Sequence, residues 1–281
     1  MELLSQHGCH GGVQRFYRHS SAAIGLPMRF SVYLPPQAMA AGARVPALFY
    51  LAGLTCTEET FMIKAGAQRF AAQHGLALVA PDTSPRGAGV PGEADAWDFG
   101  VGAGFYLDAT EAPWHTHWRM ESYVADELFT LVTSSLPIDH DRVGIFGHSM
   151  GGHGALVLAQ RHADRFRSVS AFAPIAAPMQ CPWGEKAFRG YLGPDRSHWA
   201  GHDASMLMAG QQSAPFPQGI LVDQGLDDQF LATQLHPEAF EAACEAVGQP
   251  LQLRRHSGYD HGYYFISTFI EDHIRHHAGQ L

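Results

Sequence analysis

The chain has 281 residues, of which 46% are hydrophobic and 16% charged, so its composition excludes a disordered or fibrous protein. Its 18 basic and 27 acidic residues give a formal charge of −9, which disfavours binding to nucleic acid or to an anionic membrane surface. The length suits one large α/β domain, and we expect a single domain over residues 1–281.

Cysteine spacing and the absence of long apolar segments predict a cytoplasmic protein. The four cysteines, Cys9, Cys56, Cys181 and Cys244, form no C-x-x-C pair, which favours free thiols in a reducing compartment. No run approaches 18 consecutive apolar residues, and the first residues lack the pattern of a secretion signal.

In chain order, the strand and helix patterns predict a doubly wound, mostly parallel sheet with antiparallel strands at its N-terminal end. Alternation of polar and apolar residues predicts half-exposed strands over 13–19 and 29–34. Short apolar runs typical of strands buried on both faces follow at 46–51, 76–80, 143–146, 169–172 and 219–222, with a last strand at 251–255. Apolar residues spaced three and four apart predict helices over 61–74, 121–135, 151–162, 237–247 and 263–277.

Two long segments, 84–118 and 174–217, lack clear periodicity and are rich in glycine, proline and aromatic residues. Loops of this length are usually functional or disordered, and the aromatic content argues against disorder. We therefore expect ordered excursions that line a pocket, with Trp97 and Trp183 as candidate lining residues.

A candidate nucleophile lies in Gly147-His148-Ser149-Met150-Gly151, a G-x-S-x-G motif between a predicted strand and a predicted helix. This is the context of the nucleophile turn of α/β-hydrolases, in which a sharp turn exposes the serine hydroxyl. The backbone N–H of Met150, at the start of the helix, is then placed to bind an oxyanion. The sequence thus predicts Ser149 as a catalytic serine.

A serine needs a histidine as base and an acid to orient that histidine, and in this fold the chain order is serine, acid, histidine. The acid follows a late strand, where both Asp227 and Asp228 occur. The histidine follows the last strand, which favours His261 over His256 at the strand end. Spacing alone does not choose between the two aspartates.

The second oxyanion donor is expected from the loop after the third strand of the fold. Here that loop contains Gly53, which allows close backbone approach, and Leu54, which offers its N–H.

Several longer blocks resemble the S-formylglutathione hydrolase (esterase D) family over nearly the whole chain. They are Leu51-Ala-Gly-Leu-Thr-Cys-Thr-Glu-Glu59, Trp97-Asp-Phe-Gly-Val-Gly-Ala-Gly-Phe-Tyr106, Asp108-Ala-Thr110, Gly147-His-Ser-Met-Gly-Gly-His-Gly154, Cys181-Pro-Trp-Gly-Glu-Lys-Ala-Phe188, Asp223-Gln-Gly225 and Gly258-Tyr-Asp-His261. One departure is Ala52, where the family commonly has serine; we expect it to be tolerated.

The resemblance implies an α/β-hydrolase fold and hydrolysis of S-formylglutathione, a glutathione thioester, to glutathione and formate in formaldehyde removal. It implies that the catalytic acid is Asp228, because the family's aspartate precedes x-Phe-Leu. It also implies a thiol near the active site at Cys56, and members of the family are often homodimers. No cofactor is implied.

The mechanism we expect is attack by Ser149 on the formyl carbonyl, with His261 as base and a formyl-enzyme intermediate. A broad short-chain carboxylesterase would use the same residues, and a related fold also serves acyltransferases. Lys64, Lys186 or Arg189 could bind the substrate carboxylates, but the sequence does not place them.

The 18 histidines raise the alternative of a metal site, but none of their spacings matches a zinc pattern, so no metal is expected. We expect most histidines other than His261 to be surface or capping residues.

Overall fold

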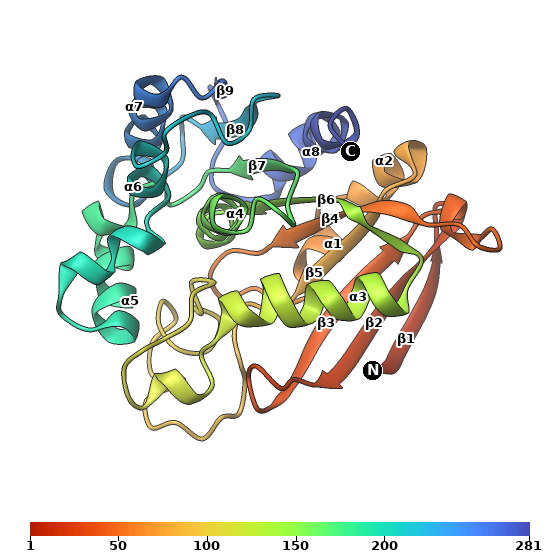
Figure 1. Cartoon of the computed structure of the whole chain (residues 1–281), viewed down its shortest axis with the longest axis horizontal. Coiled ribbons are helices and arrows are strands. Elements are labelled where there is room, and N and C mark those ends of the chain that lie inside the picture. Colours follow the sequence, from red (N-terminus) through yellow and green to blue (C-terminus); the bar gives the residue numbers. More distant parts are fainter.

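The computed structural model describes all 281 residues and is built on one nine-stranded sheet in the order β1-β2-β3-β5-β4-β6-β7-β8-β9 (Figure 1). The strands are β1 (Glu2–Cys9), β2 (Gly12–Ser20), β3 (Pro27–Leu34), β4 (Val45–Leu51), β5 (Ala77–Pro81), β6 (Ile138–His148), β7 (Ser168–Phe172), β8 (Ile220–Gly225) and β9 (Leu251–His256). Pairing is antiparallel from β1 to β3 and between β3 and β5, and parallel from β5 to β9. This confirms the predicted mostly parallel sheet with antiparallel N-terminal strands.

Strand β1 was not predicted, because its side chains are mostly exposed and carry no alternating apolar pattern. It pairs with β2 from Glu2 opposite Arg18 to Cys9 opposite Gly12, and it forms one edge of the sheet.

The helices are α1 (Thr60–Lys64), α2 (Ala67–His74), α3 (Phe129–Ser135), α4 (Met150–Arg161), α5 (Pro182–Leu192), α6 (Ala204–Ala209), α7 (Pro237–Val247) and α8 (Tyr263–Ala278). Shorter helical turns lie at Pro36–Met39, Trp114–Thr116, Pro178–Gln180, Arg196–His198 and Ala200–His202, and wider π-type turns at Ser122–Leu128 and Leu231–Leu235.

Two helix predictions differ from the structure. The helix predicted over 61–74 is two helices, because Gly66 adopts a left-handed φ of 67° between α1 and α2. The segment 174–217 contains α5 and α6, which were not predicted as helices. α6 is only six residues long, and the helical period of α5 is visible in its buried residues, Trp183, Gly184, Ala187, Phe188, Tyr191 and Leu192.

Helices cover both faces of the sheet (Figure 1). Helix α2 packs beside α8, which lies on β7 and β8, while α4 packs on β6 and β7 and contacts α6, which in turn contacts α7. A contiguous core of 76 buried residues extends from Tyr17 on β2 to Ile274 on α8, so strands and helices share one interior. No helix has the length and apolar character needed to cross a membrane.

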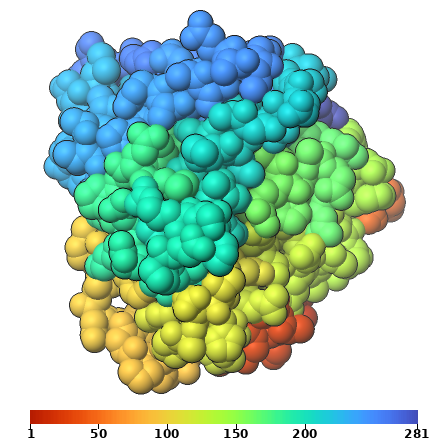
Figure 2. All heavy atoms as spheres, turned by 60° about the vertical axis from the view of Figure 1, so that its left-hand side comes forward, coloured from red at the N-terminus to blue at the C-terminus, as the bar shows by residue number.

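The two long segments of the sequence analysis pack against each other, as Figure 2 shows for the orange-to-yellow and teal surfaces. The side chain of Tyr191 on α5 accepts a hydrogen bond from the backbone N–H of Gly100 at 2.8 Å and donates one to the carbonyl of Ala103 at 2.9 Å. The expectation that these segments are ordered is met by their buried aromatic residues, which include Phe105, Trp118 and Tyr191.

Candidate active site

Ser149 lies in a strained turn between the end of β6 and the start of α4. Its backbone has φ 58° and ψ −119°, a conformation that L residues rarely adopt, and its side chain is 3% exposed. The turn closes only because the residues two positions before and two positions after the serine are glycines. A Cβ atom at Gly151 would lie 2.0 Å from the carbonyl oxygen of Leu51, and one at Gly147 would lie 2.2 Å from the carbonyl oxygen of Gly151. The sequence therefore pre-forms the sharp geometry that presents a serine hydroxyl.

His261 and Asp228 form a hydrogen-bonded pair, with 2.5 Å between Nδ1 of the histidine and Oδ2 of the aspartate. The Asp228 carboxylate is fully buried, whereas the His261 side chain is 15% exposed. Two further donors hold the carboxylate: the backbone N–H of Phe230, 2.8 Å from Oδ1, and Nε2 of Gln224, 3.3 Å from Oδ2. A carboxylate fixed on both oxygens orients the imidazole so that its other nitrogen is free to accept a proton.

The loops that carry the acid and the histidine are joined by backbone hydrogen bonds. The N–H of Leu226 donates to the carbonyl of His256 at 2.9 Å, and the N–H of Asp227 donates to the carbonyl of Tyr259 at 3.0 Å. The Asp227 side chain is exposed and has no hydrogen-bond partner, in contrast to that of Asp228. Of the two aspartates that spacing left open, the structure places Asp228 against the imidazole.

His261 lies beside the segment that carries the serine. Its ring centroid is 4.4 Å from that of His148, the residue before Ser149, and 5.0 Å from that of Phe230. The Ser149 hydroxyl has no hydrogen-bond partner among the protein groups, so it is free to turn toward the imidazole. Asp228 and His261 are thus in contact, and Ser149 lies on the neighbouring segment, all three beyond the carboxyl ends of β8, β9 and β6.

His148 is buried with both ring nitrogens unpaired. Burial holds the pKa of its imidazole well below the usual range, and the neighbouring His261 lowers that pKa further. The ring is therefore neutral at physiological pH and does not place a second positive charge beside His261.

The predicted oxyanion loop lies against the serine. A Cβ atom at Gly53 would lie 3.2 Å from Cβ of Ser149 and 3.3 Å from Nδ1 of His148, so the glycine permits the close approach. The backbone N–H groups of Leu54 and Met150 donate to no other protein group. Two unpaired donors beside a serine are the requirement for binding a developing oxyanion.

Cys56 lies on the same loop, half-buried, with its N–H donating to the carbonyl of Gly53 at 3.3 Å. Burial raises the pKa of its thiol, an effect partly opposed by the Thr60 hydroxyl and the positive charge of Lys64. Its thiol lies beside the hydroxyl of Tyr263, whose pKa burial raises well above normal. The structure places this thiol near the site in a protonated form.

Aromatic rings form a continuous row leading away from His261. Phe230 packs against Trp183 with 4.7 Å between ring centroids, and Trp183 packs edge-on against Trp97 at 5.5 Å. Trp183 is buried, whereas Trp97 is 56% exposed at the outer end of the row. The two tryptophans chosen from the sequence therefore lie together on one side of the histidine.

A second group of polar side chains, buried beneath α8, was missed. Nδ1 of His273 lies 2.8 Å from the Ser170 hydroxyl, and its Nε2 lies 3.2 Å from Oδ2 of Asp223. His277 bridges the hydroxyls of Ser168 and Ser170 at 2.6 and 2.9 Å. The expectation of surface histidines is wrong for His273 and His277, which are fully buried because serine hydroxyls and a carboxylate satisfy them.

The His273 and Asp223 pair helps to hold together the strands and the helix that flank Asp228 and His261. Arg254 on β9 donates to both oxygens of Asp223 at 2.6 and 2.5 Å, and it reaches Asp272 on α8 at 2.7 Å. This joins β8, β9 and α8, which flank the loops of Asp228 and His261. The only feature of the sequence that pointed to this buried cluster was the spacing of the histidines on one helix.

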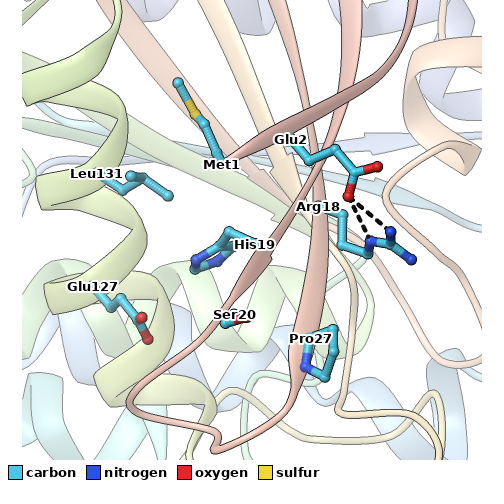
Figure 3. A pocket seen from close by; sticks show the side chains of 8 residues that line it. All are labelled: Met1, Glu2, Arg18, His19, Ser20, Pro27, Glu127 and Leu131. Atoms are coloured by element: carbon cyan, nitrogen blue, oxygen red, sulfur yellow. Dashed lines mark hydrogen bonds and ion pairs between the residues drawn. The ribbon is translucent and has the colours of Figure 1, made fainter.

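A large open cavity lies far from these residues in the chain and outside the predicted site. It has a volume of about 770 Å³ and is lined by Met1, Glu2, Arg18, His19, Ser20, Pro27, Glu127 and Leu131 (Figure 3). The carboxylate of Glu127 is already bound by the N–H groups of Ala22 and Ala23, and Arg18 pairs with Glu2. The charged side chains of this cavity, Glu2, Arg18 and Glu127, thus have partners within the protein.

Known proteins are similar to this chain over its whole length. A family model described as "Putative esterase" matches residues 21–276. A rat S-formylglutathione hydrolase is 54% identical, with 100% of this chain and 99% of that protein covered. An S-formylglutathione hydrolase from Arabidopsis thaliana is 53% identical, covering 96% of this chain and 94% of that protein. The solved structure of an S-formylglutathione hydrolase from Agrobacterium tumefaciens has a TM-score of 0.96 at 47% identity, with 100% of both chains covered.

Proposed function

The chain belongs to the esterase family and, within it, to the S-formylglutathione hydrolases, and from this premise we propose that it hydrolyses S-formylglutathione to glutathione and formate. The observation that carries the choice of substrate is the full-length match, at 54% identity, to a protein of that name. The geometry around Ser149 supports the chemistry, because a serine in a strained turn lies near a histidine–aspartate pair and two unpaired N–H donors.

In the proposed first half-reaction, Oγ of Ser149 attacks the formyl carbon and its proton passes to Nε2 of His261. Asp228 holds the opposite nitrogen of the imidazolium, and the N–H groups of Leu54 and Met150 bind the oxyanion. The carbon–sulfur bond then breaks and glutathione leaves. A thiol with a pKa near 8.5 leaves readily as the thiolate, so it needs little protonation before the bond breaks. The departing thiolate then takes the proton from Nε2 of His261, which restores the neutral imidazole for the second half-reaction.

In the second half-reaction, water attacks the formyl ester on Ser149. His261 takes the proton of the water and returns it to the serine oxygen as formate departs. Both half-reactions use the same oxyanion donors. Because Ser149 is only 3% exposed, the site suits an acyl group as small as formyl.

The kinetic test compares formate release from S-formylglutathione with acetate release from a short-chain aryl ester. We expect the thioester to have the higher kcat/KM, and we expect Ser149→Ala to lose both activities. A higher kcat/KM on the aryl ester would instead identify a broad short-chain carboxylesterase. Formate release that required an added alcohol would point to an acyltransferase.

Three further properties are part of this proposal. A single core supports one domain over residues 1–281, and limited proteolysis tests it by the absence of stable fragments. Four free cysteines fit a reducing compartment and support a cytoplasmic location, which cell fractionation tests. The family resemblance supports a homodimer, which light scattering tests.

A further inference from the structure

The chain has only two lysines: Lys64 lies 5.6 Å from the ring centroid of Tyr263, and Lys186 lies on α5 one helical turn from Trp183. This placement bears on substrate binding, because glutathione carries two carboxylates and one ammonium group while the protein carries a formal charge of −9. An anionic protein needs local cations to bind an anionic ligand. The inference below rests on the proposed function.

Lys186 forms an ion pair with Asp98 that joins α5 to the loop before it. Trp97 directly precedes Asp98, and Trp183 lies one helical turn before Lys186. The pair therefore lies at the outer end of the aromatic row formed by Trp97, Trp183 and Phe230, which leads to His261. Its two side chains remain accessible, with exposed fractions of 44% for Lys186 and 16% for Asp98.

An adjacent cation and anion complement a free amino acid group, which carries a carboxylate and an ammonium on the same carbon. The γ-glutamyl end of glutathione is such a group. Its carboxylate can accept hydrogen bonds from Lys186 while its ammonium donates to Asp98. The exposed face of Trp97 offers an apolar surface for the intervening methylene groups.

Lys64 is the last residue of α1, the helix that follows the oxyanion loop. Its ammonium is 5.6 Å from the ring centroid of Tyr263, which follows the histidine by two residues. No carboxylate lies within ion-pair distance of Lys64, and its charge acts on the thiol of Cys56 in the oxyanion loop. Lys64 is therefore a cation without a carboxylate partner, close to Tyr263 and to the thiol of the oxyanion loop, and it is available to a substrate carboxylate.

The two arms of glutathione differ in length. The glycine carboxylate of glutathione is one residue away from the thioester sulfur, at about 3.5 Å per residue, while the γ-linked glutamyl group reaches further. We therefore assign the short arm to Lys64, whose charge acts on the Cys56 thiol in the oxyanion loop, and the long arm to the ring row that leads from His261 toward Lys186.

We propose that the Lys186–Asp98 pair binds the γ-glutamyl amino acid group of the substrate and that Lys64 binds its glycine carboxylate. The ring row orients the substrate between these two anchors, so that the thioester lies over Ser149. Selectivity for a glutathione thioester over neutral acyl compounds then arises from these two anchors.

The test uses four formyl thioesters with the wild-type enzyme, Lys186→Met and Lys64→Met. S-formylglutathione has both ends; S-formyl-γ-glutamylcysteine lacks the glycine, S-formyl-N-acetylcysteinylglycine lacks the γ-glutamyl group, and S-formyl-N-acetylcysteamine lacks both. Each activity is expressed as kcat/KM relative to that on the neutral thioester. Arg167→Met, which removes an exposed positive charge at the amino end of β7, is the matched control.

We expect Lys186→Met to lower the relative kcat/KM about tenfold on the two substrates that keep the γ-glutamyl group, the size of one charge-assisted hydrogen bond. Lys64→Met should lower it about tenfold on the two that keep the glycine, and both effects should appear in KM. Arg167→Met should leave every ratio unchanged.

The outcomes separate the inference from the proposed function. A wild-type enzyme that prefers S-formylglutathione, with ratios unchanged in both lysine variants, would overturn the inference and leave the function intact. An equal loss on all four thioesters would also overturn it, because it would indicate a general structural defect. A wild-type enzyme without preference for S-formylglutathione over the neutral thioester would refute the proposed substrate itself.

Discussion

Replacing Asp228 by asparagine tests the assignment of the acid with almost no change in shape. The N–H of Phe230 donates to Oδ1 and the N–H of His261 donates to Oδ2, so the asparagine oxygen can replace only one acceptor. With its oxygen turned to Phe230, the new NH₂ group faces Nδ1 of His261, which must then accept. The imidazole proton moves to Nε2, the atom that should accept the proton of Ser149, and the base is lost.

The size of the effect follows from this change of tautomer. An asparagine in place of a triad aspartate lowers kcat by about 10⁴, a value known from a serine protease, which corresponds to about 5.5 kcal/mol of transition-state stabilisation. Initial rates of formate release from S-formylglutathione, measured for purified Asp228→Asn and wild type, give this ratio directly. Circular dichroism and a urea unfolding curve check that the variant is folded.

The neighbouring Asp227 provides the matched control. Its side chain is exposed and unpaired, so Asp227→Asn should keep kcat within about twofold, as surface substitutions usually do. The assignment of the acid would be refuted if Asp227→Asn lost activity and a folded Asp228→Asn kept it.

Two further predictions concern the backbone and the buried histidines. Gly151→Ala should abolish folding of the nucleophile turn and with it the activity, because the new Cβ would lie 2.0 Å from the Leu51 carbonyl oxygen. The control Gly8→Ala should remain soluble and active, because a Cβ atom at Gly8 meets nothing within 4 Å. Burial lowers the pKa of His153 to about 3 and that of His276 to about 4. Below pH 6.5 the unfolded chain takes up protons that the folded protein excludes, so the free energy of unfolding should fall with falling pH by at most about 1.4 kcal/mol per unit for each such histidine. Urea unfolding at pH 7 and pH 5 should show a smaller fall for His153→Leu than for wild type, and an unchanged fall for the exposed His74→Leu; equal falls in all three would contradict the reasoning.

The parallel part of the sheet was predictable because its strands are continuous apolar runs, and the helix over 237–247 was predicted with its observed bounds. The edge strand β1 was not predictable, since strand pairing with β2 rather than burial holds it in place. The break between α1 and α2 depends on the positive φ of Gly66, and a helical apolar period ran through that residue without interruption.

The candidate site shows the same division between local and long-range information. The turn at Ser149 is encoded by adjacent glycines, so the motif predicts its position. The aspartate next to His261 depends on how the loop after β8 turns, and spacing left Asp227 and Asp228 equivalent. The cluster of Ser170, Asp223 and His273 joins residues more than 40 positions apart in the chain, and no local pattern links them.

That cluster has a consequence for recognising active sites by their shape. Ser170, His273 and Asp223 form a hydrogen-bonded serine–histidine–aspartate chain, and each of the three residues is completely inaccessible to solvent. A template that required only a serine, a histidine and an aspartate in contact would therefore return this cluster as a second candidate triad, although Asp223 meets Nε2 of His273 whereas Asp228 meets Nδ1 of His261. The two sites differ in the backbone of the serine: Ser170 continues a regular strand, whereas Ser149 stands in a turn with positive φ. The order of the ring nitrogens, the backbone conformation and access to a reactant thus distinguish a candidate nucleophile from a structural hydroxyl.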